Sequence, residues 1–155
     1  MLSRKTDKRE AKIRNDIVTA FIEYKAKILL LKRSQNVKTM KGKWAGVSGY
    51  IEKSEPPVRR ALTEIQEETG LAAKNIEFLK EGKPLEATDS TRPADIIWVV
   101  HPFYFRANTD EIRLDWEHDA YEWVKPAEIG SYDTVPHLKE AFDRVCSNPM
   151  HYLED

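Results

Sequence analysis

Short runs of β-branched and aromatic residues alternate with polar segments along this chain, a pattern typical of a mixed α/β domain. Residues 16–24 and 28–31 read as two strands of a hairpin joined by a tight connection at Lys25 and Ala26. A basic, polar loop follows over residues 34–43. Pro102 suggests a bend or a sheet edge within the longest strand signal. Further strands are expected over residues 44–51, 75–87, 95–107 and 120–124.

Two helices are predicted from hydrophobic spacing. The first follows Pro56 and Pro57, which suit a first helical turn, and it ends at Gly70, with Ser54 or Glu55 near the N-cap. A second amphipathic helix is expected over residues 134–145, and residues 126–129 suit a single helical turn. The predicted buried positions are Val58, Ala61, Leu62 and Ile65 in the first helix, and Leu138, Ala141, Phe142 and Val145 in the second.

Length and composition fit one globular domain, because 155 residues with 41% hydrophobic content can bury a proper core. We expect a charged N-terminal arm over residues 1–15, the domain over residues 16–146, and a C-terminal tail over residues 147–155. A net charge of −1 does not favour nucleic-acid binding. The single cysteine, Cys146, excludes an internal disulfide, and no apolar run is long enough for a membrane span. A cytoplasmic protein is expected.

Three carboxylates in the first helix carry the clearest chemical signal. Glu64, Glu67 and Glu68 stand at i, i+3 and i+4, which places them on one helix face, away from the predicted apolar side. Like charges this close repel one another unless a positive charge lies among them. A divalent cation is the simplest such charge, because hard cations bind carboxylate oxygens.

The stretch from Gly49 to Leu71 resembles the Nudix box, G-x5-E-x7-R-E-U-x-E-E-x-G-U, where U is a bulky apolar residue. Gly49, Glu55 and Gly70 fall at the required offsets, and the one departure is Thr63, where the box has arginine. The resemblance implies a Nudix (MutT-like) hydrolase whose fold is an α/β/α sandwich with a mixed β-sheet.

The resemblance also implies a reaction, in which water attacks a pyrophosphate bond of a nucleoside diphosphate linked to another group. The substrate would be a small-molecule nucleotide, either an oxidised or ordinary nucleoside triphosphate or an ADP-ribose-like compound, and the cofactor Mg²⁺ or Mn²⁺. By position, Glu67 and Glu68 would be metal ligands, Glu64 a ligand or the group that orients water, and the Gly49 carbonyl a further ligand. A homodimer is a possible assembly, and neither a membrane nor nucleic acid is an expected partner.

Many relatives use a further acidic residue beyond the box as a base or an extra ligand. Glu117 is the first candidate for this role, in the acidic segment before the 120–124 strand. Glu122 is the second, and Asp115 and His118 stay open.

Thr63 raises the question of which residue supplies the missing positive charge. Arg60 lies at i−4 from Glu64, and Arg59 lies at i+4 from Glu55, so either could orient the acidic residues. If neither does, the chain would be a Nudix-fold nucleotide-binding or regulatory module with weak or lost catalysis.

Substrate-binding side chains are harder to identify from sequence. Arg33, Trp44 and Tyr50 are the chosen candidates for phosphate contact and base stacking. Further candidates are Lys32 and Arg92 for phosphate, and Trp98, Phe103 and Tyr104 for a base, with at most one or two of the aromatic residues expected to touch a ligand.

Overall fold

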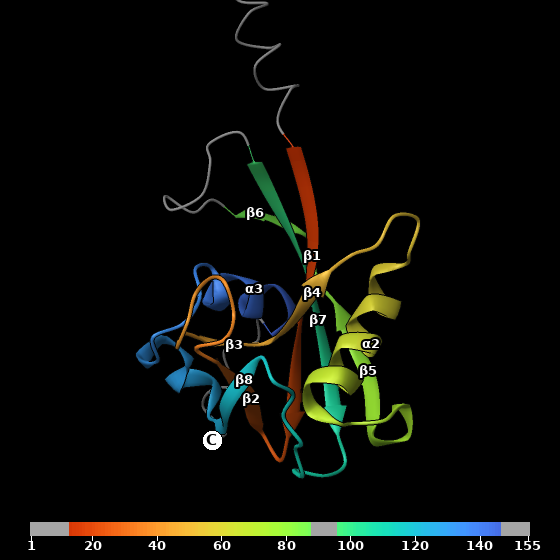
Figure 1. The fold of residues 1–155 in the computed structure, drawn as a ribbon. Helices are drawn as coiled ribbons and strands as arrows, with labels where there is room; N and C mark the ends of the chain where they lie inside the picture. The colour runs from red at the N-terminus through yellow and green to blue at the C-terminus, as the bar shows by residue number, and fades with distance from the viewer. Residues whose placement is uncertain (1–12, 88–95, 147–155) are drawn as a thin grey trace, which may run out of the picture.

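A computed structural model describes residues 13–87 and 96–146, and over these ranges the protein is a mixed β-sheet between two helical layers (Figure 1). The five strands in the main path have the order β3-β2-β1-β7-β5, while β4, β6 and β8 pair with β1, β7 and β2. This arrangement confirms the predicted α/β/α fold class. The strands are β1 (Ile13–Tyr24), β2 (Lys27–Arg33), β3 (Trp44–Ala45), β4 (Val47–Tyr50), β5 (Ile76–Glu81), β6 (Leu85–Ala87), β7 (Ile96–Ala107) and β8 (His118–Val124); the helices are α2 (Pro57–Thr69), η1 (Ala73–Asn75), η2 (Pro126–Ser131) and α3 (Leu138–Val145).

Strand β1 is the centre of the sheet. It pairs in parallel with β7 from Ile13 to Glu23, and antiparallel with β4 from Ile17 to Ala20. The predicted hairpin to β2 is confirmed, and its two turn residues, Lys25 and Ala26, have φ angles of 48° and 66°. Positive φ at both central residues is the conformation of a two-residue hairpin turn that suits the strand twist.

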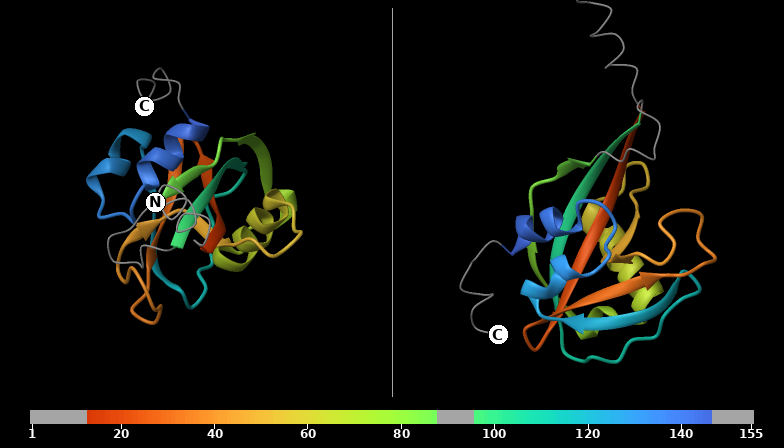
Figure 2. Two further views of the ribbon diagram at one scale, coloured as in Figure 1. Left: turned by 90° about the horizontal axis from the view of Figure 1, so that it is seen from above. Right: turned by 90° about the vertical axis from the view of Figure 1, so that its left-hand side faces the viewer.

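The helical layers cover opposite faces of the sheet (Figure 2). Alternate β1 residues divide between them, so Val18 packs in the cluster beneath α2 and Phe21 in the cluster beneath α3. The predicted apolar stripe of α3 is confirmed, because Leu138, Ala141, Phe142 and Val145 are all buried.

The predicted buried face of α2 is partly wrong. Ala61 and Ile65 are fully buried, but Leu62 is 38% exposed, whereas Glu68 is only 3% exposed. Positions 61, 65 and 68 form one i, i+4, i+7 stripe, and Leu62 lies about 100° around the helix from Ala61. Burial of Glu68 therefore follows from the helix register, with a carboxylate in a position that the pattern reserves for an apolar residue.

The helix boundaries of α2 agree with the sequence at one end only. Gly70 ends the helix with φ 77°, and its N–H donates to the Gln66 carbonyl, as its glycine predicts. At the other end the N-cap is Pro56, rather than Ser54 or Glu55.

The expectation that Pro102 marks a sheet edge is wrong, because β7 lies between β1 on one side and β5 and β6 on the other. The partner strand changes from β6 to β5 at Pro102, where its carbonyl accepts a hydrogen bond from Gly82 N–H at 2.9 Å. In a β-strand, the N–H and the carbonyl of one residue point toward the same neighbouring strand. The N–H that Pro102 lacks would therefore point to the side where the partner strand changes from β6 to β5.

Three other boundaries differ from the expected ones. Strand β1 begins at Ile13, so residues 13–15 belong to the sheet rather than to the arm. Strand β8 begins at His118, two residues before the expected start. Helix α3 begins at Leu138, because Pro136 and the left-handed backbone of His137 (φ 68°) precede it. Residues 1–12, the tail from residue 147, and Arg92 lie outside the described residues. Over the described ranges, no helix is both long and apolar enough to cross a membrane.

Candidate active site

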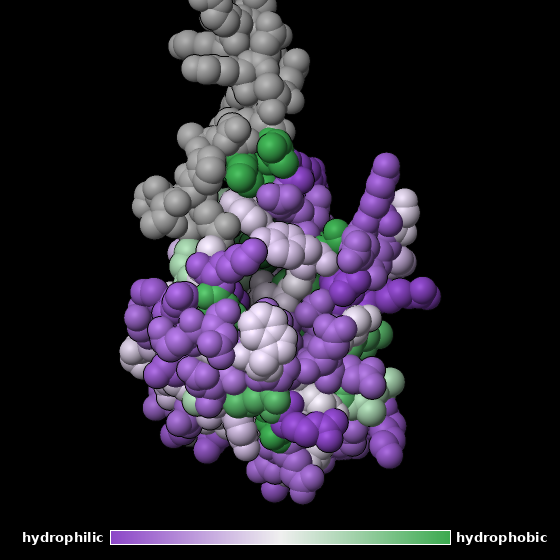
Figure 3. Space-filling view, viewed as in Figure 1, coloured by the Kyte–Doolittle hydropathy of each residue, from purple (hydrophilic) through white to green (hydrophobic). Residues whose placement is uncertain are grey.

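A cavity of about 440 Å³ opens on the face shown in Figure 3, which is hollowed near its middle among mostly hydrophilic residues. Sheet strands and α3 supply apolar lining, including Val100 and Leu138. Helix α2 and the segment before β8 supply the carboxylates Glu64, Glu67 and Glu117. The cavity therefore joins an apolar wall to an acidic one.

The guanidinium of Arg60 bridges two of the predicted site residues. Its Nε and Nη2 donate to the two Glu55 oxygens at 2.9 and 3.1 Å, and its Nη1 donates to Glu64 Oε2 at 2.9 Å. The Glu52 N–H also donates to Glu55, at 3.0 Å. The hydrogen bond from Arg60 lowers the pKa of Glu55, and its two carboxylate partners raise the pKa of Arg60.

These contacts belong to Arg60 and not to Arg59, whose side chain is exposed. Arg60 lies three residues before Thr63, so both residues belong to the same side of α2. A guanidinium one turn earlier on the helix thus occupies the position between Glu55 and Glu64.

Gly49 is packed directly against Glu64. A Cβ atom at Gly49 would lie 2.4 Å from Glu64 Cδ and 2.6 Å from its Oε2. Any side chain at this position would therefore displace the Glu64 carboxylate. Glycine allows this carboxylate to lie directly against the backbone at position 49.

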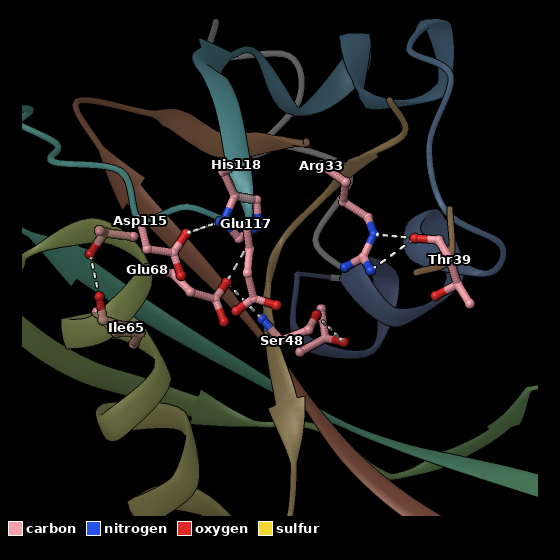
Figure 4. A network of polar contacts seen from close by, with 10 residues as sticks. Arg33, Thr39, Ser48, Ile65, Glu68, Asp115, Glu117 and His118 are labelled. Carbon is pink, nitrogen blue, oxygen red and sulfur yellow. Dashed lines mark hydrogen bonds and ion pairs between the residues drawn. The ribbon is translucent and has the colours of Figure 1, made fainter. Parts of the chain in front are cut away.

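Glu68 is a buried carboxyl group among other acidic residues (Figure 4). Its Oε1 accepts from Ser48 N–H at 3.4 Å and lies 3.7 Å from His118 Nε2. Burial raises the pKa of Glu68 to about 11, with further contributions from a hydrogen bond to Glu64 and from the charges of Glu64 and Asp115. Without a cation, Glu68 therefore keeps its proton at neutral pH.

A β-bulge positions the second group of acidic residues. The register between β2 and β8 shifts between Lys32 and Arg33, and the Ser34 N–H donates to the Glu117 carbonyl at 2.8 Å. Glu117 lines the cavity, and its pKa is raised chiefly by burial and then by Asp115. Asp115 Oδ1 is 2.8 Å from His118 Nδ1, and His118 Nε2 is 3.7 Å from Glu68 Oε1. Asp115 and His118 are therefore linked to the carboxylates of α2 through Glu68.

Glu122, the second candidate for the further acidic residue, is exposed on β8 opposite Leu30. It is not among the residues that line the cavity. The structure therefore brings Glu117 to the box carboxylates and leaves Glu122 apart from them.

Two of the three chosen substrate-binding candidates line the cavity. Tyr50 is 60% exposed and its ring centroid lies 5.9 Å from that of Trp98, which also lines the cavity. Arg33 lines it too, with its guanidinium donating to the Thr39 carbonyl at 3.0 and 3.1 Å. Trp44 instead packs edge-on against Tyr132, with the ring centroids 5.3 Å apart.

Phe103 and Tyr104 are wrong as base-stacking candidates, because both side chains are buried in the core. Lys32 is not among the cavity-lining residues. Sequence reasoning missed Met40 and His137, which line the cavity with φ angles of 56° and 68°. Non-glycine residues with positive φ carry no hydrophobic periodicity, so the sequence offers no signal for them.

The carboxylate oxygens are suitable ligands for a divalent cation, but they are not arranged as a preformed coordination site. Over residues 13–87 and 96–146, no group of three His, Cys, Asp or Glu side chains is arranged closely enough to hold a metal. Glu64 is engaged by Arg60, and burial raises the pKa of Glu68. Yet all the donors are hard oxygens, the ligands that divalent cations such as Mg²⁺ and Mn²⁺ prefer.

Comparisons with known proteins identify the family of this chain. The family model described as NUDIX domain matches residues 14–145. An asymmetrical bis(5'-nucleosyl)-tetraphosphatase from Rattus norvegicus is 29% identical over 113 residues, covering 68% of this chain and 74% of the relative. The structure of a MutT protein from Methanosarcina mazei has a TM-score of 0.67 at 26% identity and covers 86% of this chain and 93% of its own.

A dihydroneopterin triphosphate pyrophosphohydrolase from E. coli has the same fold, with a TM-score of 0.69 at 18% identity, covering 88% of this chain and 100% of its own. The family model spans most of the chain, including the whole Gly49–Leu71 stretch and Glu117. The protein therefore belongs to the NUDIX domain family.

Proposed function

We propose that this protein hydrolyses a pyrophosphate bond of a small nucleotide with the aid of Mg²⁺ or Mn²⁺. The observation that carries the proposal is that Glu64, Glu67 and Glu117 line one cavity with Tyr50 and Trp98. Carboxylates for a cation and aromatic rings for a base therefore meet in a single cavity.

The proposed ligands of the cation are the carboxylates of Glu64, Glu67 and Glu68, together with the Gly49 carbonyl. When bound, the cation supplies positive charge that neutralises the pyrophosphate and acidifies an attacking water. The chain's own contribution is orientation, because Arg60 and Gly49 hold the Glu64 carboxylate in place.

Glu117 is the proposed general base. Burial raises its pKa above the usual range of a carboxylic acid, which makes its carboxylate a better proton acceptor near neutral pH. It lines the cavity beside the box carboxylates, where an attacking water would lie.

For the nucleotide, we propose that the phosphates lie beside Arg33 and the base against Tyr50 and Trp98. A dinucleoside polyphosphate is the first substrate to test, because the two rodent relatives are both asymmetrical bis(5'-nucleosyl)-tetraphosphatases. A nucleoside triphosphate is the second, since the Methanosarcina mazei structure is of a MutT protein.

A second candidate function is a nucleotide-binding module with weak or lost catalysis, which the threonine at position 63 favours. The contacts of Arg60 with Glu55 and Glu64 count against it, because they supply a guanidinium despite that substitution.

A substrate panel tests the enzyme proposal directly. With Mg²⁺ or Mn²⁺, we expect turnover of at least one among diadenosine polyphosphates, 8-oxo-dGTP, ordinary nucleoside triphosphates, ADP-ribose and NADH, followed by release of phosphate, pyrophosphate or nucleoside monophosphate. Glu67→Gln should lower kcat/KM about 100-fold. Glu122 is exposed on β8, so the kcat/KM of Glu122→Gln should match that of the wild type. A folded protein that cleaves no panel member would contradict the enzyme proposal, and a fully active Glu67→Gln would contradict the ligand assignment.

Replacing Arg60 tests the orienting ion pairs. Arg60→Ala should lower kcat about 10- to 100-fold, because Glu64 loses the partner that holds it. Arg59→Ala is the matched control on the same helix turn and should stay within about twofold of the wild type. Thr63→Arg in the Arg60→Ala background should restore part of the lost turnover. Equal losses in the two single variants would show that Arg60 has no special role.

Gly49→Ala tests the close approach to Glu64. The added Cβ must displace the Glu64 carboxylate, and a shift of about 1 Å at a reacting group costs about 100-fold in kcat. Because the clash is with the end of a side chain, the melting temperature should change little. Gly130→Ala, whose Cβ would meet no atom within 4 Å, is the control for both measurements. Full activity of Gly49→Ala would refute the need for this contact.

The raised pKa of Glu68 predicts a pH-dependent stability. Without a cation, Glu68 keeps its proton in the folded state up to about pH 11 but loses it near its ordinary pKa of 4.5 when unfolded. Stability from this group is therefore complete below pH 4.5 and falls as the pH rises toward 11. A divalent cation replaces the proton, so Mn²⁺ should raise the melting temperature more at pH 8 than at pH 5.5 and release protons into weakly buffered solution.

Glu68→Gln is the variant that isolates this effect, because glutamine has no proton to lose. In the presence of EDTA its melting temperature should vary less with pH than that of the wild type, and its affinity for Mn²⁺ should fall. An unchanged pH dependence in this variant would assign the effect to another group.

A further inference from the structure

The two most exposed large hydrophobic side chains of the described residues both lie next to the carboxylate site. Trp116 is 67% exposed and directly precedes Glu117, while Tyr50 is 60% exposed and directly follows Gly49. We propose that Trp116 stacks against a second base of the substrate, while Tyr50 contacts the first. This inference rests on the proposed function and makes the substrate a dinucleoside polyphosphate.

The backbone around Trp116 is held by hydrogen bonds on both sides. Asp115 Oδ1 accepts from the Glu117 N–H at 3.3 Å and contacts His118 Nδ1 at 2.8 Å. The Glu117 carbonyl accepts from Ser34 N–H at 2.8 Å, and Arg113 N–H donates to the Thr69 carbonyl at the end of α2 at 2.9 Å. The exposed indole therefore projects from an ordered segment, which is how a binding residue is kept in position.

One carboxyl group of the site contacts residues that are close in sequence to each of the two aromatic residues. Glu68 Oε1 contacts Ser48 N–H, two residues before Tyr50, and His118 Nε2, two residues after Trp116. The same close-up shows Ser48 and His118 on either side of Glu68 (Figure 4). Tyr50 ends β4, which pairs with β1, whereas Trp116 precedes β8, which pairs with β2, so the two residues come from separate parts of the chain and sheet.

An indole offers a flat π-face that stacks on a nucleobase of any identity. A nucleoside triphosphate has one base, which the cavity beside Tyr50 and Trp98 would take. A polyphosphate with its scissile bond at the carboxylates and a nucleoside at each end would use both Tyr50 and Trp116. The exposed indole is therefore explained by a substrate with a second aromatic group.

Equilibrium binding of two uncleavable ligands tests this inference without relying on turnover. The ligands are methylene-bridged analogues of diadenosine tetraphosphate and of ATP, titrated by calorimetry with Mg²⁺ present. Trp116→Ala should raise the Kd of the dinucleotide about tenfold and leave that of the ATP analogue within about twofold. Trp116→Phe should keep most of the dinucleotide affinity, because it retains a ring.

Two further variants complete the comparison. Tyr50→Ala should weaken both ligands, since each has a base for the cavity. Tyr121→Ala removes another exposed aromatic side chain, on β8, and should change neither. Equal weakening of both ligands by Trp116→Ala, or weakening of neither, as for a tryptophan that contacts another protein, would overturn the inference.

The outcomes also separate this inference from the proposed function. If the wild type cleaves no nucleotide but Trp116→Ala selectively weakens the dinucleotide, the enzyme proposal fails and the second base site stands. If the wild type cleaves nucleotides and Trp116→Ala binds both ligands normally, the second base site fails and the enzyme proposal stands.

Discussion

The arrangement of the site depends on how the negative charge along α2 is balanced. Arg60 contacts Glu55 and Glu64 at once, and so joins the segment after β4 to the helix that carries the acidic face. A two-pronged guanidinium suits this place because it can bind two carboxylates in fixed directions. The side chains of these three residues are largely buried, at 15% exposure or less, so the ion pairs are shielded from solvent in a way that surface pairs are not. Gly49 then lies against Glu64, so charge balance and close packing fix the same carboxylate.

The remaining site residues are positioned by the sheet rather than by the helix. Strand β1 holds β4, whose Ser48 N–H reaches Glu68, and β2 holds β8, whose first residue is His118. The bulge at Lys32 and Arg33 shifts the register just before Glu117, and the Ser34 N–H fixes the Glu117 carbonyl. The acidic wall is thus assembled from segments that are distant in sequence.

This division explains what the sequence could and could not predict. Local spacing was enough for α2, its end at Gly70 and the shared face of Glu64 and Glu67, because each depends on residues within two helix turns. The helix register places Glu68 on the buried stripe, but local spacing could not show that Ser48 and His118, from other strands, lie against its carboxyl group. Phe103 is buried in the core and Trp44 packs against Tyr132, because aromatic residues in strands face the core or the cavity according to long-range pairing. Met40 and His137 line the cavity through backbone conformations that no periodicity marks.

The charge around the cavity also limits how a substrate can enter. The guanidinium of Arg60 is engaged by Glu55 and Glu64, so the further carboxyl groups of Glu67 and Glu117 make this wall acidic. A polyphosphate is itself strongly negative, and like charges in a partly buried site repel over several ångströms. Arg33 lines the cavity and carries one positive charge. Its guanidinium already donates to the Thr39 carbonyl. A divalent cation, as proposed above, would offset this repulsion and so favour entry of the nucleotide.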